Sequence, residues 1–211
     1  MADPNNTPQP GTPEYDQMMK EYYGESYELG YRVSFGKRLG AFIVDLIFLG
    51  IVGTIVASAT GFIELMMDLG REAQMSGQLF MSPEDMPAEA IAEITTASIY
   101  VSLSFLVYWL LEIFLSASFG KLVLGLKIGS AERTEANMQQ LIIRFVVRHM
   151  GLILSILGSI TAVELLGSLS SLGTLIFVIG SFFILSNKRQ AVHDIAGKTA
   201  VYHKNSLKGN Q

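Results

Sequence analysis

Residues 38–63 read RLGAFIVDLIFLGIVGTIVASATGFI, and this stretch decides the fold. Between Leu39 and Ile63 it is predominantly apolar, and Asp45 is its single ionisable residue. An α-helix rises about 1.5 Å per residue, so about 20 apolar residues cross a hydrocarbon layer about 30 Å thick. The stretch therefore predicts a membrane-spanning helix that carries one carboxylate inside the membrane.

Two further stretches are also predominantly apolar, and together they are predicted to supply three more spans. Residues 94–117 are long enough for a second span, and Glu112 is their only ionisable residue. Residues 151–186 are apolar but too long for one helix, and polar and small residues around Glu164 interrupt them. We therefore predict a tight hairpin of two more helices, so that the four spans cover about residues 39–63, 94–117, 141–163 and 169–186.

The composition agrees with an all-α membrane protein. Half of the 211 residues are hydrophobic and 16% are charged, whereas a soluble domain carries about 25% charged residues. An isoelectric point near 5.4 argues against a nucleic-acid binder. The chain has no cysteine, and no set of His, Asp and Glu residues has metal-ligand spacing. No nucleophile–base pair stands out either, so the sequence predicts no enzyme, no metal site and no cofactor.

The positive residues predict how the four helices cross the membrane. Of the 15 Lys and Arg residues, only Arg71 lies in the loop that joins the first two spans, residues 64–93. That loop also contains seven Asp and Glu residues. Because Lys and Arg are enriched on the cytoplasmic side, we expect this loop outside and both termini in the cytoplasm. The chain would then be a multi-pass protein of an inner or plasma membrane.

The cytoplasmic segments divide into two tails and a small folded cap. Residues 1–30 hold four of the six prolines and no apolar run, so we expect a disordered cytoplasmic tail. Residues 31–203 make up the membrane domain, and residues 204–211 form a C-terminal tail. Two stretches are predicted to pair as short strands of the cap, because they are bounded by glycines or rich in β-branched residues. They are Phe119–Ile128 and Thr199–His203.

Polar residues recur at helical spacing where the third span begins. The residues that share this polar face are Asn137, Gln140, Arg144 and Arg148. Leu141 and its apolar neighbours lie opposite them, which predicts an amphipathic helix that enters the third span. The alternative is a helix that lies on the membrane surface with its arginines on lipid phosphates.

Ionisable residues from three spans fall at similar depth. At about 1.5 Å per residue, Asp45 lies ~9 Å and Glu112 ~7.5 Å from the cytoplasmic ends of their helices, and Arg148 lies ~10.5 Å along the third. Arg38, seven residues before Asp45, lies on the same helix face at the membrane boundary. In one interpretation, Arg38, Arg144 and Arg148 neutralise the two carboxylates and hold the helices together. In the other, Asp45 or Glu112 faces a water-filled cavity and exchanges a proton for a cation.

Several short motifs follow one another along the chain. They are residues 38–45 (RLGAFIVD), Phe119-Gly120-Lys121 with residues 125–128 (GLKI), Arg144 with Arg148, and residues 189–199 (RQAVHDIAGKT). Together these motifs resemble the RDD family of membrane proteins, which is named for one arginine and two aspartates. On this resemblance Arg38 is the signature arginine, and Asp45 and Asp194 are the signature aspartates. Asp194 follows the last span, so we expect it to fold back and pair with Arg38 or Arg148.

The resemblance also implies candidate functions. Some RDD-family members are described as sodium/proton antiporters, and a eukaryotic relative is an assembly partner in a membrane degradation complex. We therefore expect a bacterial inner-membrane protein that moves a monovalent cation against protons, with Asp45 and Glu112 as the ion or proton site, tuned by Arg144 and Arg148. Four short helices enclose little volume, so we also expect a homodimer. The alternative is a non-transporting scaffold or assembly factor that binds a partner protein.

Overall fold

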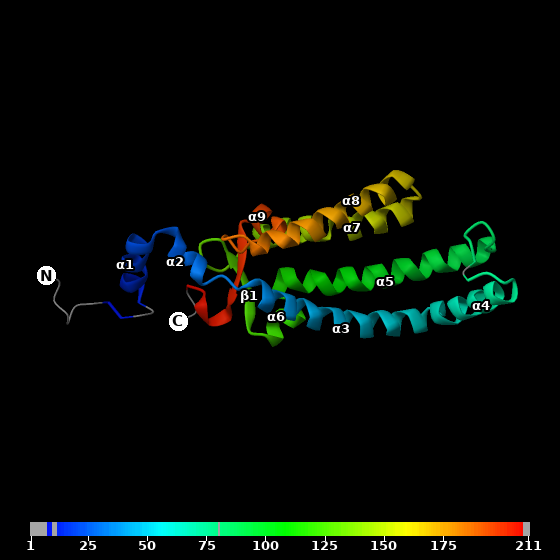
Figure 1. The fold of residues 1–211 in the computed structure, drawn as a ribbon, viewed down its shortest axis with the longest axis horizontal. Helices are drawn as coiled ribbons and strands as arrows, with labels where there is room; N and C mark the ends of the chain where they lie inside the picture. Colours follow the sequence, from blue (N-terminus) through cyan, green and yellow to red (C-terminus); the bar gives the residue numbers. More distant parts are fainter. Residues whose placement is uncertain (1–7, 10–11, 80, 209–211) are drawn as a thin grey trace.

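Four long helices run side by side in the computed structural model, which describes residues 8–9, 12–79 and 81–208 (Figure 1). They are α3 (Phe35–Ala59), α5 (Ala88–Leu115), α7 (Met138–Thr161) and α8 (Glu164–Ser181), and α8 continues into the 3₁₀ turn η2 (Phe182–Leu185). Each is long and apolar enough to cross a membrane. The predicted fold class is confirmed, because the chain has four candidate spans and one small two-stranded sheet within the described residues.

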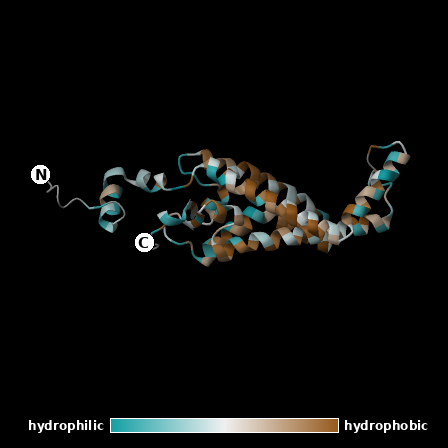
Figure 2. Cartoon of the chain, turned by 90° about the horizontal axis from the view of Figure 1, so that it is seen from below, coloured by the Kyte–Doolittle hydropathy of each residue, from teal (hydrophilic) through white to brown (hydrophobic). Residues whose placement is uncertain are grey.

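The long helices turn apolar side chains outward along their length. Figure 2 shows hydrophobic residues along the bundle and more hydrophilic ones toward its two ends. On α3, for example, Ile47, Ile51 and Ile55 are more than half exposed and recur on one helix face. A soluble protein does not expose an apolar face of this extent, so we assign it to contact with lipid.

The helices begin a few residues earlier than the hydropathy pattern predicts, and local capping explains this for α7. Asn137 accepts a hydrogen bond from the backbone nitrogen of Gln140, whose side chain accepts one from the backbone of Asn137. This capping box starts the helix at Met138. At the other end, Ala162 takes a left-handed conformation with φ of 53°, and α8 begins two residues later. The predicted hairpin is present, with a shorter connection than expected.

Glycines bring α7 and α8 into close contact. A methyl group added at Gly173 would lie 2.8 Å from the backbone nitrogen of Gly151, and one added at Gly158 would lie 3.0 Å from that of Gly167. Small residues commonly allow such an approach between membrane helices. The third and fourth spans therefore pack backbone against backbone.

The two-stranded sheet lies at one end of the bundle. β1 (Leu126–Ser130) pairs antiparallel with β2 (Thr199–His203), and Ile128 lies opposite Val201. This confirms the predicted pairing of the two segments. The buried side chains of Leu126, Ile128 and Val201 join the apolar core beneath the sheet.

The strand predicted over Phe119–Ile128 is wrong in its first half, because Phe119–Val123 form the short helix α6. The carboxylate of Asp45 on α3 explains the difference. It accepts hydrogen bonds from the hydroxyl of Ser118 and from the backbone nitrogen of Gly120, which are groups at the start of α6. A contact with a distant helix therefore overrides the local β-branched pattern.

The prediction of a disordered tail over residues 1–30 is also corrected, because two helices lie within it. They are α1 (Pro13–Tyr23) and α2 (Glu25–Gly30), and residues 1–7 and 10–11 of the predicted tail lie outside the described residues. Thr12 caps α1, since its side chain accepts a hydrogen bond from the backbone nitrogen of Tyr15.

Arg133, in the turn after β1, holds these two helices against the sheet. It pairs with Asp16 of α1 and lies 3.6 Å from a carboxylate oxygen of Glu28 in α2. Its guanidinium also lies 3.8 Å from the centre of the Tyr31 ring. The helices α1 and α2 are held by a residue more than a hundred positions away, which their own composition does not reveal.

Three short elements complete the fold. α9 (Val192–Ala196) packs on α7, and η3 (Lys204–Ser206) follows β2. α4 (Phe62–Met75) occupies the end of the bundle opposite to the sheet (Figure 1). The loop predicted over residues 64–93 therefore contains a helix.

We expect Gly173→Ala to destabilise the protein by about 1–3 kcal/mol, because the added methyl group meets the backbone of Gly151. Gly167→Ala in the same helix is the control, since a methyl group there would meet nothing within 4 Å. Thermal unfolding of both variants in detergent measures the difference. Equal melting temperatures for the two variants would contradict the close packing of α7 and α8.

Candidate functional site

Three cationic side chains surround the buried carboxylate of Glu112, near the end of α5. Lys121 Nζ lies 2.7 Å from Oε2, Arg144 Nε lies 3.0 Å from Oε1, and Arg148 Nη1 lies 2.9 Å from Oε2. The predicted contact of Glu112 with the two arginines is present. Lys121, which α6 brings in, adds a cation that sequence reasoning missed.

A second carboxylate, that of Asp194 in α9, is fully buried and holds two more guanidinium contacts. Arg38 Nη1 lies 2.6 Å from Oδ2, and Arg144 pairs with Oδ1. Oδ2 also accepts a hydrogen bond of 3.0 Å from the backbone nitrogen of Ala191, which lies at the start of α9. The predicted Arg38–Asp194 ion pair is confirmed, and the second partner is Arg144 and not Arg148.

Asp45 stands apart from this network, although it is only 2% exposed. Its oxygens accept hydrogen bonds from Tyr108 Oη at 2.5 Å, Gly120 N at 2.6 Å and Ser118 Oγ at 2.7 Å. Within the described part of the chain no Lys or Arg forms an ion pair with it. The interpretation that arginines neutralise both intramembrane carboxylates is therefore wrong for Asp45.

Arg38 does not pair with Asp45 because its side chain extends in another direction. Arg38 shares a helix face with Asp45, but its guanidinium extends toward the sheet end of the bundle. There it donates to the backbone oxygens of Val33 and Arg189 as well as to Asp194. Sequence spacing gives the face of a helix but not the direction in which a long side chain extends.

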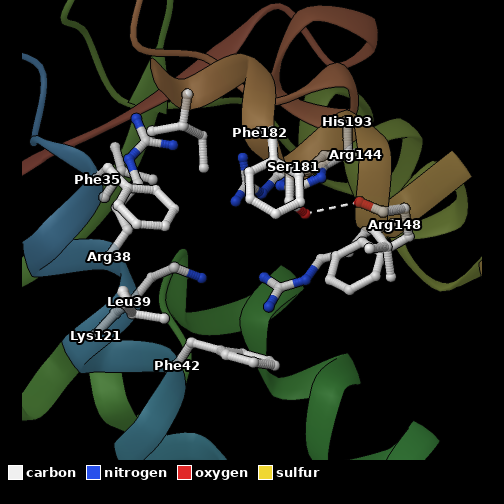
Figure 3. A pocket seen from close by; sticks show the side chains of 14 residues that line it. Phe35, Arg38, Leu39, Phe42, Lys121, Arg144, Arg148, Ser181, Phe182 and His193 are labelled. Atoms are coloured by element: carbon white, nitrogen blue, oxygen red, sulfur yellow. Dashed lines mark hydrogen bonds between the residues drawn. The ribbon is translucent and has the colours of Figure 1, made fainter. Parts of the chain in front are cut away.

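A cavity of about 330 Å³ lies beside the network, between α3 and the α8–η2 segment. Figure 3 shows Lys121, Arg144 and Arg148 with their charged ends turned toward this space. Arg38 and His193 also line it. The remaining wall is apolar and comprises mainly Phe35, Leu39, Phe42, Phe177, Val178 and Phe182.

Positive charge exceeds negative charge around this cavity. The four cations Arg38, Lys121, Arg144 and Arg148 face the two carboxylates Glu112 and Asp194, which leaves two positive charges. Counting Asp45, which does not line the cavity, still leaves one when Lys121 is charged.

The surroundings of the cavity shift the pKa of two side chains outside the spans, those of Lys121 and His193. Burial lowers the pKa of Lys121 to about 7, against the opposing effect of Glu112. With Lys121 neutral, three arginines still outnumber the two carboxylates that they contact, and they equal the carboxylates in number when Asp45 is counted. Burial, together with the charges of Arg144 and Arg148, holds the pKa of His193 well below its usual range, so its imidazole is neutral.

Residues 32–198 match the model of the RDD family. The chain belongs to the RDD family. No curated protein and no solved structure matches it significantly. The RDD region contains all four long helices and the complete set of ion pairs around the cavity, while α1, α2 and β2 lie outside it.

The three residues that the sequence resemblance assigns to the family signature have different structural roles in this RDD protein. Arg38 and Asp194 form one buried ion pair between the start of α3 and α9. Asp45 instead holds the start of α6, the helix that carries Lys121 to Glu112. Asp45 therefore acts on the charged network through the position of α6.

We expect Asp194→Asn to destabilise the protein by about 3–5 kcal/mol, because two buried guanidinium groups lose their carboxylate partner. The matched control is Asp68→Asn, whose ion pair with Arg71 is exposed, with 68% and 73% of the two side chains accessible. An exposed pair contributes less than about 1 kcal/mol. Thermal unfolding in detergent compares the two, and a small loss for Asp194→Asn would show that the buried pair is dispensable.

Proposed function

We propose that this RDD-family membrane protein binds an anionic ligand in the cavity between α3 and the α8–η2 segment. The observation that supports the proposal is the excess of buried cations over carboxylates at that cavity. Buried charge without a counter-charge is costly, so an anion that entered would offset this excess. A cation would meet Arg38, Arg144 and Arg148 and would be repelled.

We also propose that the cavity lies at the cytoplasmic side of an inner or plasma membrane, with both termini in the cytoplasm. Of the 15 Lys and Arg residues, only Arg71 lies at the α4 end of the bundle. The positive-inside rule then favours the sheet end, which carries the cavity, as the cytoplasmic end. The ligand would be an anion of the cytoplasm or of the inner leaflet.

Trp109 offers a direct readout of binding, because it is the single tryptophan and the Arg148 guanidinium lies 4.5 Å from the centre of its ring. We expect hexyl phosphate to change Trp109 fluorescence saturably in nonionic detergent. Hexyltrimethylammonium, of similar size and opposite charge, is expected to leave it unchanged. Arg148→Gln should weaken hexyl phosphate binding about ten-fold, the effect of one lost charge-assisted hydrogen bond.

Lys188→Gln is the control variant, since Lys188 is an exposed cation that does not line the cavity. Glu112 keeps Lys121 and Arg144 as partners in Arg148→Gln, so that variant is expected to fold. No response to hexyl phosphate, or an equal response to the ammonium probe, would refute an anion site.

Monovalent cation/proton antiport is the second candidate function, and the environment of Asp45 supports it. This buried carboxylate has only neutral hydrogen-bond donors among the described residues. Ionisable groups of this kind inside a membrane often carry protons or ions. Glu112 is a weaker candidate than the sequence suggests, because three cations already share its charge.

In sealed liposomes, we expect an antiporter to dissipate an imposed pH gradient when sodium, lithium or potassium is added. Asp45→Asn should abolish this response, and Asp68→Asn in the exposed α4 pair should preserve it. A gradient that persists in the wild-type protein, or a response that survives Asp45→Asn, would eliminate antiport through Asp45. The homodimer and the scaffold role stay predictions.

A further inference from the structure

The cavity at the charged network continues toward the middle of the bundle. A second cavity, of about 440 Å³, lies between α3, α5, α7 and α8. The two cavities share Phe42, Arg148 and Phe177 in their walls, so they adjoin at these side chains. We call the two neighbouring cavities together the cleft, and Arg148 lines both of them.

The two halves of the cleft differ in chemistry. The half near the sheet end contains Lys121, Arg144 and Arg38, as described above. The half toward the middle of the membrane is mainly apolar. Its side chains include Leu46, Leu49, Phe105 and Leu152. A ligand that fills both halves must therefore have an anionic end and an apolar end.

Two residues that line the cleft each have a buried nitrogen atom without a hydrogen-bond partner among the described residues. The two atoms are Nε of Arg148, whose side chain is 8% exposed, and Nε2 of His149, which is 9% exposed. Buried polar groups are rarely left without a partner. Both residues line the apolar half, and Arg148 also lines the charged half, so a movement of these side chains would bring their nitrogens to an oxygen-bearing headgroup.

The cleft also borders the lipid-facing surface. Leu39 and Val178, on the two helices that flank the charged half, are 42% and 47% exposed. α3 packs mainly on α5 and α6, whereas α8 packs mainly on α7, so these helices do not close the cleft against each other. A lipid can enter sideways between α3 and α8 without leaving the membrane.

We propose that the ligand is a membrane lipid whose anionic phosphate binds Lys121, Arg144 and Arg148, and whose acyl chain extends along the apolar half of the cleft. This inference rests on the proposed anion-binding function and names its ligand class. A phosphate monoester carries between one and two negative charges near neutral pH, which matches the cationic excess. Basic pockets between membrane helices are a known way to hold phosphate headgroups.

The test uses delipidated, full-length protein in nonionic detergent and three probes. They are phosphatidic acid, phosphatidylcholine with the same acyl chains, and glycerol 3-phosphate, the water-soluble part of the headgroup. We expect phosphatidic acid to change Trp109 fluorescence and to raise the melting temperature. Phosphatidylcholine, whose ammonium group neutralises the phosphate, and glycerol 3-phosphate should do neither at equal concentration.

Variants separate the two halves of the site. Arg148→Gln should weaken phosphatidic acid binding about ten-fold. Val178→Phe should obstruct lipid entry and weaken binding while leaving the cations in place, and Leu39→Phe tests the same entrance from α3. Leu172→Phe is the control, because Leu172 is an exposed residue of α8 that lines neither cavity.

The outcomes distinguish the lipid from the anion. Equal effects of glycerol 3-phosphate and phosphatidic acid would overturn the proposal of a lipid ligand and leave a site for soluble phosphates. Binding of phosphatidic acid that is unchanged in Arg148→Gln, Val178→Phe and Leu39→Phe would place the lipid elsewhere and overturn the inference. Failure of hexyl phosphate as well as phosphatidic acid would refute the anion site itself.

Discussion

Arg144 joins two buried carboxylates that come from distant parts of the chain. Its guanidinium contacts Glu112 of the second span and Asp194 of α9, and it is itself only 2% exposed. Because Asp194 also holds Arg38, one cation in the third span connects the first and second spans to the C-terminal segment. Helix packing at this end of the bundle therefore combines these ionic contacts with the apolar core beneath the sheet.

Each charged group of this network contacts at least one group of opposite charge. Removing one member leaves the others buried without counter-charge, at a cost of several kcal/mol. The backbone is shaped to allow the contacts: a methyl group at Gly197 would lie 2.9 Å from Cβ of Arg144, and one at Gly120 would collide with the backbone oxygen of Ala41. Glycine at these two positions lets α9 approach α7 and lets α6 approach α3.

The apolar runs and the order of the motifs were sufficient to predict the four spans, the strand pairing and the Arg38–Asp194 pair. The contact of Lys121 with Glu112 could not be predicted from the sequence. Lys121 follows the second span, and its position depends on α6, whose start is held by Asp45. One of the two interpretations pairs Asp45 with the arginines, because helical spacing does not reveal that Tyr108 and Ser118 supply its donors. The order of α1 and α2 depends on Arg133, a partner remote in sequence.

The position of Asp194 after the last span has a consequence for biogenesis. During synthesis, Arg38 enters the membrane first, yet its carboxylate partner emerges from the ribosome only after all four helices have been made. Arg144 has Glu112 available earlier, since the second span precedes the third. An unfinished or truncated chain that lacks Asp194 therefore retains an Arg38 guanidinium without this carboxylate partner.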